Sequence, residues 1–161
     1  MSAPALDVRL VAYTDPLVLP LLADLDREYS ARYGHTLGDL HQEALRGAAE
    51  FGPPDGGILL LLDDGEPVAG GAFRRLDEHT AELKRIWTHS AHRRRGLARR
   101  VLAELEREIA ARGYRRIHLT TGPRQPEAKG LYLATGYTPL YDPDLPPERI
   151  GPHPFEKELQ P

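Results

Sequence analysis

A short basic turn between a predicted strand and a predicted helix constrains this chain more than any other feature. The turn has the sequence Arg93-Arg94-Arg95-Gly96-Leu97-Ala98. Residues 82–87 before it have a strand-like pattern, and residues 97–112 after it repeat apolar side chains at helical spacing. The first N–H groups of a helix lack partners within the helix, the helix dipole is positive there, and glycine allows close backbone approach. The turn is therefore predicted to bind phosphate; an ordinary basic surface turn is the alternative interpretation.

The composition favours one domain, residues 1–161, with 40% hydrophobic and 28% charged residues. The absence of cysteine excludes disulfides, thiolate metal sites and cysteine nucleophiles. A net charge of −3 argues against general attraction to nucleic acid or to an anionic membrane. The N-terminus lacks a signal-peptide pattern, and no apolar run approaches the ~20 residues that span a bilayer, so a cytoplasmic protein is predicted.

Hydrophobic periodicity predicts an alternating order of strands and helices. Two antiparallel hairpins lead into the strand before the basic turn, and the strand after the following helix should run parallel to it. The predicted strands are 7–13, 58–62, 67–76, 80–88, 114–121, 137–141 and 155–159, and the predicted helices are 16–32, 39–50, 97–112 and a short one from Gln125 to Gly136.

Two spaced motifs carry a resemblance to a known family. Arg93-x-x-Gly96-x-Ala98 and Ala128-x-x-Leu131-Tyr132-x-x-x-Gly136-Tyr137 resemble the two signatures of the GNAT acetyltransferase superfamily, and they stand in the family's order. The resemblance implies an α/β fold with a mixed sheet, in the GNAT-like order β-α-α-β-β-β-α-β-α-β-β. It also implies an acetyl-CoA-dependent N-acetyltransferase that acts on a primary amine of a small molecule or peptide.

The resemblance implies a set of residues that bind acetyl-CoA. Backbone N–H groups of residues 94–98 would hold the pyrophosphate, while a bulge in the preceding strand would pair with pantetheine and point an N–H at the thioester carbonyl. Trp87, in that bulge, is equally well explained as a core aromatic. Gln125 stands where many members have an asparagine. The implied set is Ile86, Trp87, Thr88, Arg93, Arg94, Arg95, Gly96, Leu97, Ala98, Arg99, Gln125 and Tyr132.

Two residues are predicted to move protons. An amine with a pKa near ~10 is mostly protonated at neutral pH, so a general base helps it react. By resemblance this base is Glu82, with a strand carboxylate paired to Lys84 or Arg74, or a water relay, as the alternatives. Tyr132 stands at the family's general-acid position, where it would protonate the departing thiolate; a buried core tyrosine is the alternative.

Acceptor recognition is predicted from position alone. Tyr33 and Arg74 are candidates to bind a small polar amine or a carboxylate, within walls formed by the first two helices and the proline-rich residues 142–154. No metal is predicted, because His89 and His92 have no third ligand nearby.

Two competing functions remain compatible with the sequence. The first is a non-catalytic acyl-CoA-binding or regulatory domain, and the second is a nucleic-acid binder that uses the arginines of the basic turn, which the overall acidity disfavours. The absence of cysteine agrees with direct attack in a ternary complex. The resemblance also implies a homodimer, for which the free edge of the last strand offers a contact.

Overall fold

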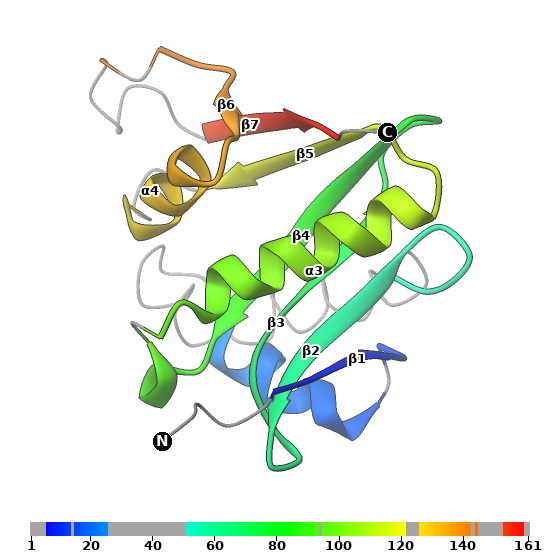
Figure 1. Cartoon of the computed structure of the whole chain (residues 1–161), viewed down its shortest axis with the longest axis vertical. Helices are drawn as coiled ribbons and strands as arrows, with labels where there is room; N and C mark the ends of the chain where they lie inside the picture. The colour runs from blue at the N-terminus through cyan, green and yellow to red at the C-terminus, as the bar shows by residue number, and fades with distance from the viewer. Residues whose placement is uncertain are drawn as a thin grey trace.

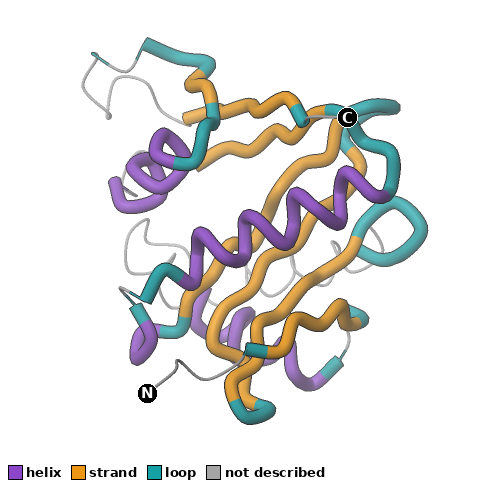
Figure 2. The backbone as a smooth tube through the Cα atoms, viewed as in Figure 1, coloured by secondary structure: helices purple, strands orange, loops and turns teal. Residues whose placement is uncertain are grey.

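The structure is a computed structural model that describes residues 6–13, 15–25, 51–93, 95–121, 126–142, 144 and 153–159. Within them one seven-stranded sheet has the order β1-β2-β3-β4-β5-β7-β6 (Figures 1 and 2). The strands are β1 (Asp7–Val11), β2 (Gly57–Asp63), β3 (Glu66–Arg75), β4 (Thr80–Thr88), β5 (Arg116–Thr121), β6 (Thr138–Pro139) and β7 (His153–Glu158), and the helices are η1 (Pro16–Val18), η2 (Ser90–His92), α3 (Leu97–Ala111) and α4 (Pro126–Ala134).

The mixed sheet confirms the predicted fold. Strands β1 to β4 are antiparallel neighbours, β5 runs parallel to β4, and β7 pairs antiparallel with both β5 and β6. Residues 19–25 continue η1 as a helix, as predicted, whereas the rest of that helix and the predicted helix 39–50 lie outside the described residues.

The position predicted for the last strand is wrong. We expected its edge to be free, but β7 lies between β5 and β6, so β1 and β6 are the edges of the sheet. Thr138 pairs with Glu156 on one side of β7, and His118 of β5 pairs with the same residue on the other. Among the described strands, a dimer contact through an outer edge of the sheet would therefore involve β1 or β6.

Two hydrophobic clusters cover the two faces of the sheet. Helix α3 lies across one face (Figure 1), where its Val101, Leu105 and Ile109 are fully buried. Strand β2 contributes to both clusters: Leu59 and Leu61 belong to the α3 side, and Ile58, Leu60 and Leu62 to the opposite side. This division explains why β2 is apolar at every position from 58 to 62. We call the two faces the α3 face and the opposite face; on the latter Phe51 and Trp87 pack with Tyr13, Val18 and Leu21.

Glycines 70 and 71 of β3 lie where neighbouring atoms leave no room for a side chain. A Cβ on Gly70 would lie 2.7 Å from the carbonyl oxygen of Leu59 and 2.7 Å from a methyl carbon of Leu60. A Cβ on Gly71 would lie 2.6 Å from the Cδ1 of Ile86 on β4 and 2.9 Å from Leu105 on α3. The glycine pair therefore allows both layers to approach the centre of the sheet closely.

We expect Gly70→Ala to lower the free energy of unfolding by about 1–3 kcal/mol, because the backbone carbonyl of Leu59 cannot move aside as a side chain can. Gly130→Ala is the matched control: Gly130 lies in α4 with no atom within 4 Å of an added Cβ, so the change should stabilise by about 0.5–1 kcal/mol. Urea unfolding of both variants measures the difference. Equal stabilities for the two variants would contradict the close packing around Gly70.

Candidate active site

Strands β4 and β5 separate after a short paired segment. Only Thr80, Ala81 and Glu82 pair with β5, opposite Arg116 to His118, and among the described residues no part of β5 pairs with residues 83–88. Figure 1 shows the two strands diverging toward the ends that carry η2 and α4. Beyond this point β5 pairs with β7 alone through Thr121. The backbone of β4 therefore has an edge on the β5 side that another extended chain can pair with.

A bulge interrupts β4 within this unpaired segment. The register with β3 shifts between Gly70 and Ala72, so that Arg85 and Ile86 together oppose Gly71. Arg85 has a φ of 62°, a left-handed conformation that is uncommon for a residue with a side chain. The predicted bulge residues were Ile86, Trp87 and Thr88; the structure includes Ile86, whereas Trp87 and Thr88 pair with Gly70 and Ala69 of β3.

Helix α3 begins with a glycine and with no side-chain cap. Gly96 is the N-cap residue, and its φ of 73° and ψ of 16° are left-handed, which explains why glycine stands there. Because no side chain caps the helix within the described residues, the N–H groups of its first turn can bind a ligand. Leu97 anchors this turn in the core with 5% of its surface exposed, while Ala98 is half-buried.

The basic residues that the structure describes at the turn are exposed, and Arg95 among them contacts its neighbours. Arg93, Arg95 and Arg99 lie on the surface. The Nη1 of Arg95 lies 2.6 Å from the Nδ1 of His92 and 3.9 Å from the Oδ2 of Asp63. Arg94 lies outside the described residues. The turn thus presents guanidinium groups beside the open N-terminus of α3, an arrangement that suits phosphate.

Glu82 is buried where β4 and β5 begin to separate. It is 9% exposed, and its Oε1 accepts a hydrogen bond of 2.8 Å from the Nε of Arg74 on β3. Its Oε2 lies 3.9 Å from the Nδ1 of His118 on β5, a nitrogen that is buried without a hydrogen-bond partner among the described residues. The pairing with Arg74 was an alternative in the sequence interpretation, and here it orients the carboxylate and leaves Oε2 for other partners.

Tyr132 lies on α4, on the β5 side of the gap between the strands. It is 5% exposed, and its ring packs 5.5 Å from that of Tyr137 and 5.6 Å from that of Phe155. Burial raises the pKa of Tyr132 above the ordinary 10.0 of a phenol. The hydroxyl therefore keeps its proton at neutral pH, as a proton donor must. The neighbouring Tyr137 donates a hydrogen bond of 3.0 Å to Glu106 of α3, which fixes the end of α4.

Trp87 is a core residue on the opposite face. It is 2% exposed, and its Nε1 donates a hydrogen bond of 3.0 Å to Asp24, 63 positions earlier in the sequence. This contact agrees with the core alternative for the side chain, and the backbone of Trp87 borders the unpaired edge of β4. Two further predicted residues, Gln125 and Tyr33, lie outside the described residues.

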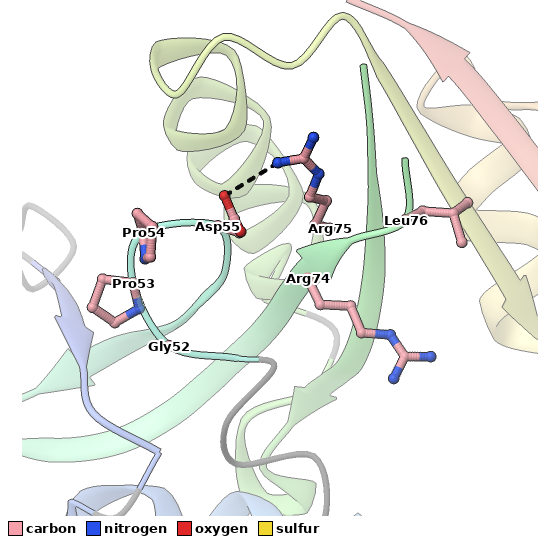
Figure 3. A pocket seen from close by; sticks show the side chains of 7 residues that line it. All are labelled: Gly52, Pro53, Pro54, Asp55, Arg74, Arg75 and Leu76. Carbon is pink, nitrogen blue, oxygen red and sulfur yellow. Dashed lines mark ion pairs between the residues drawn. The ribbon is translucent and has the colours of Figure 1, made fainter. Parts of the chain in front are cut away.

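Arg74 also borders a pocket of about 410 Å³ at the end of β3. The other lining residues are Arg75, Leu76 and the loop from Gly52 to Asp55. Figure 3 shows Arg75 pointing toward Asp55, at 3.7 Å in the ion pair, while Arg74 points away from both. Among the described residues, no other predicted site residue lines this pocket, and Arg74 both borders it and donates to Glu82.

Three nearby residues were absent from the predicted site: Asp24, Arg85 and His118. A sequence signal existed for Arg85, because Lys84 and Arg85 are followed by Ile86 and Trp87, which breaks the polar–apolar alternation as a bulge does. Asp24 and His118 carried no such signal, since their partners are remote in the sequence. Within the described residues no group of three metal-ligating side chains occurs. The helices of that same part of the chain include none long and apolar enough to cross a membrane.

Comparison with known proteins identifies the family. The sequence matches the profile of the Acetyltransferase (GNAT) family over residues 19–137, and the chain therefore belongs to the GNAT acetyltransferase family, as its two motifs predicted. The N-acetyltransferase YsnE of Bacillus subtilis (strain 168), itself described as uncharacterized, is 36% identical over 77 residues. That match covers 46% of this chain and 51% of the length of YsnE.

Solved structures share the fold. An acetyltransferase of the GNAT family from Staphylococcus aureus MU50 superposes with a TM-score of 0.77 at 14% identity, covering 97% of this chain and 100% of that one. A GNAT family acetyltransferase from Elizabethkingia anophelis, whose structure has acetyl-CoA bound, gives a TM-score of 0.66 at 14% identity, covering 96% and 98%. These similarities establish the fold alone.

Proposed function

We propose that this chain transfers the acetyl group of acetyl-CoA to a primary amine of a small molecule or peptide, by direct attack in a ternary complex. The single observation that carries the proposal is the separation of β4 from β5 immediately beside the uncapped N-terminus of α3. An extended ligand with a phosphate tail fits such a site, because it finds backbone partners along β4 and N–H donors at the helix.

The residues present fit acetyl-CoA. Residues 83–88 pair with no described residue on the β5 side of β4, and their backbone there is suited to an amide-rich arm. The first turn of α3, with Arg93, Arg95 and Arg99 around it, offers N–H donors and positive charge for a pyrophosphate. The bound cofactor supplies an activated acetyl thioester, and the known complex of the Elizabethkingia relative with acetyl-CoA supports this assignment.

Glu82 would act as the base. Arg74 fixes one oxygen, and the other oxygen takes the proton of the acceptor amine, directly or through one water. The neutral nitrogen can then form the new N–C bond as the C–S bond breaks. The nitrogen carries a positive charge once this bond has formed, and it would release one further proton to solvent to leave the neutral amide. A backbone N–H of the β4 bulge would stabilise the negative charge that develops on the carbonyl oxygen, since a preset donor needs no reorganisation.

Tyr132 would complete the transfer by giving its hydroxyl proton to the departing sulfur, and it would regain a proton from solvent. Tyr132 lies on α4, which follows β5, whereas Glu82 lies on β4, so the proposed acid and base would come from the two sides of the separated strands. The products are the N-acetylated amine and the free thiol of CoA.

Release of that thiol tests the proposal. The protein is incubated with acetyl-CoA and a panel of primary amines, and free thiol is followed over the blank without amine. We expect amine-dependent thiol release that matches the acetylated product one to one. Saturable binding of acetyl-CoA with no release above the blank for any amine would instead favour the non-catalytic acyl-CoA-binding domain.

A further inference from the structure

The bulge in β4 redirects the side chain of Arg85. Alternation along a regular strand would place Arg85 on the same face as Leu83, which packs under α3. The extra residue at the bulge changes this: Ile86 packs toward α3, while Arg85 lies over Phe51 on the opposite face, where Trp87 is also buried. A strained, left-handed residue is maintained at this position, and such strain is typical of functional sites.

The guanidinium of Arg85 contacts an aromatic ring, but its Nε–H has no hydrogen-bond acceptor among the described residues. Its central carbon lies 6.0 Å from the centre of the Phe51 ring, within the range of a cation–π contact. Its Nε is buried and has no hydrogen-bond partner among the described residues. An aromatic ring supports the charge, but it does not replace an acceptor for buried N–H groups, and leaving such a donor unpaired is costly.

Arg74 contacts the same aromatic ring as Arg85, so the hydrogen-bond partners of the two arginines can be compared. Its guanidinium lies over the same Phe51 ring, at 5.9 Å, yet its Nε donates to Glu82 at 2.8 Å. Two arginines thus share one aromatic support, and only Arg74 has a carboxylate of the protein as its partner in the described structure. The acceptor that suits Arg85 is of the same kind: an oxyanion that accepts an N–H bond from the guanidinium, as Glu82 does for Arg74.

An oxyanion bound to Arg85 would lie close to the proposed base of the acetyl transfer. Arg85 follows Glu82 by three residues on β4 and is itself part of the bulge beside the unpaired edge. A ligand bound to Arg85 would therefore lie beside the same segment of β4 as the candidate base, Glu82.

We propose that Arg85 binds an anionic group, a carboxylate or a phosphonate, of the amine acceptor. The acceptors are then small amines that also carry an oxyanion, such as amino acids. This inference rests on the proposed acetyl transfer and narrows its substrate class.

The test compares amines that differ only in charge. Amino acids from glycine to 6-aminohexanoate are assayed for thiol release against their primary amides, and aminoalkyl phosphonates separate the two kinds of oxyanion. We expect kcat/KM to be about 10- to 100-fold higher for the anionic member at the best chain length. Arg85→Gln should remove this preference, and Arg85→Lys should restore part of it, since lysine keeps the charge but loses the planar fork.

Arg107→Gln is the matched control, because Arg107 lies on α3 with 74% of its side chain exposed and pairs with Glu104. It should leave the preference intact. A preference that persists in Arg85→Gln, or equal rates for acids and amides in the wild type, would overturn the assignment of Arg85 while leaving acetyl transfer established.

A second measurement does not depend on catalysis. Trp87 is the single tryptophan of the chain and lies two residues from Arg85. Its fluorescence can report binding of the same amino acids and amides with CoA present. We expect at least about tenfold tighter binding of the acids, lost in Arg85→Gln. Equal binding of acids and amides refutes the anion site, whereas absent thiol release with every amine refutes the proposed transfer, so the two failures are distinguishable.

Discussion

Tyr132→Phe is expected to lower kcat by about 10²- to 10⁴-fold, while the KM for acetyl-CoA stays within a few-fold of the wild type. Phenylalanine keeps the ring contacts with Tyr137 and Phe155, so the fold around α4 is preserved. What it removes is the hydroxyl that would protonate the departing thiolate. Steady-state thiol release, together with a calorimetric titration of CoA binding, separates the loss in kcat from a loss of affinity.

The control for this variant is Tyr114→Phe. Tyr114 donates a hydrogen bond of 2.7 Å to the backbone oxygen of Asp55, which lines a pocket where Arg74 is the one predicted site residue among those that the structure describes. Loss of that bond should cost about 1 kcal/mol of stability and leave kcat unchanged. A kcat for Tyr132→Phe within a few-fold of the wild type would reduce Tyr132 to a core residue.

The raised pKa of Tyr132 gives the same assignment a pH dependence. Burial raises the pKa above 10.0, so the hydroxyl stays protonated throughout the range below that value. An alkaline fall of kcat centred below about pH 10 therefore cannot come from deprotonation of Tyr132. If such a fall occurs in the wild type, it should persist, at the lower rate, in Tyr132→Phe; its disappearance there would contradict the protonated state inferred from burial.

Glu82→Gln is the second change with a large expected effect, a fall in kcat of about 10²- to 10⁴-fold. Glutamine keeps the size of the side chain and cannot accept the amine proton. The change also leaves the guanidinium of Arg74 without its ion pair, which should lower the free energy of unfolding by about 1–3 kcal/mol. Activity is measured by thiol release and stability by urea unfolding.

The double variant Glu82→Gln with Arg74→Met separates chemistry from stability. Removing both members of the ion pair should recover much of the lost stability, because no buried charge is left unpaired. It should not recover kcat. A rate that returns together with stability would show that Glu82 acts only through the fold, and a near-normal rate in the single variant would point to a water relay without Glu82.

Local patterns in the sequence predicted the elements of this fold well. Strand β4 begins and ends at the residues predicted, 80 and 88, because its limits are set by neighbouring turns. Helix α3 follows from the spacing of Val101, Leu105 and Ile109, all fully buried. The insertion of β7 between β5 and β6 was not predictable in this way, since strand order depends on pairing between segments that are remote in the sequence.

The candidate site shows the same difference between residues that belong to local motifs and contacts that depend on remote segments. Gly96 and Tyr132 were found because they belong to motifs with fixed spacing, and the structure adds the left-handed backbone of one and the burial of the other. The ion pair of Glu82 was foreseen only as an alternative, since the register between β3 and β4 decides that Arg74 lies opposite it. That register depends on the bulge at Arg85, which the sequence interpretation placed at residues 86–88.

The short pairing between β4 and β5 means that few residue pairs join the two halves of the sheet, which share the hydrophobic cluster under α3. Three residue pairs join them in the described structure, from Thr80 with Arg116 to Glu82 with His118. Glu82 and Arg85 belong to one half, and Tyr132 packs on the other through Phe155 of β7. The distance between the proposed base and the proposed acid therefore depends on this short paired segment, and a substitution at Ala81 or Ile117, which pair there, should change that distance without altering either group.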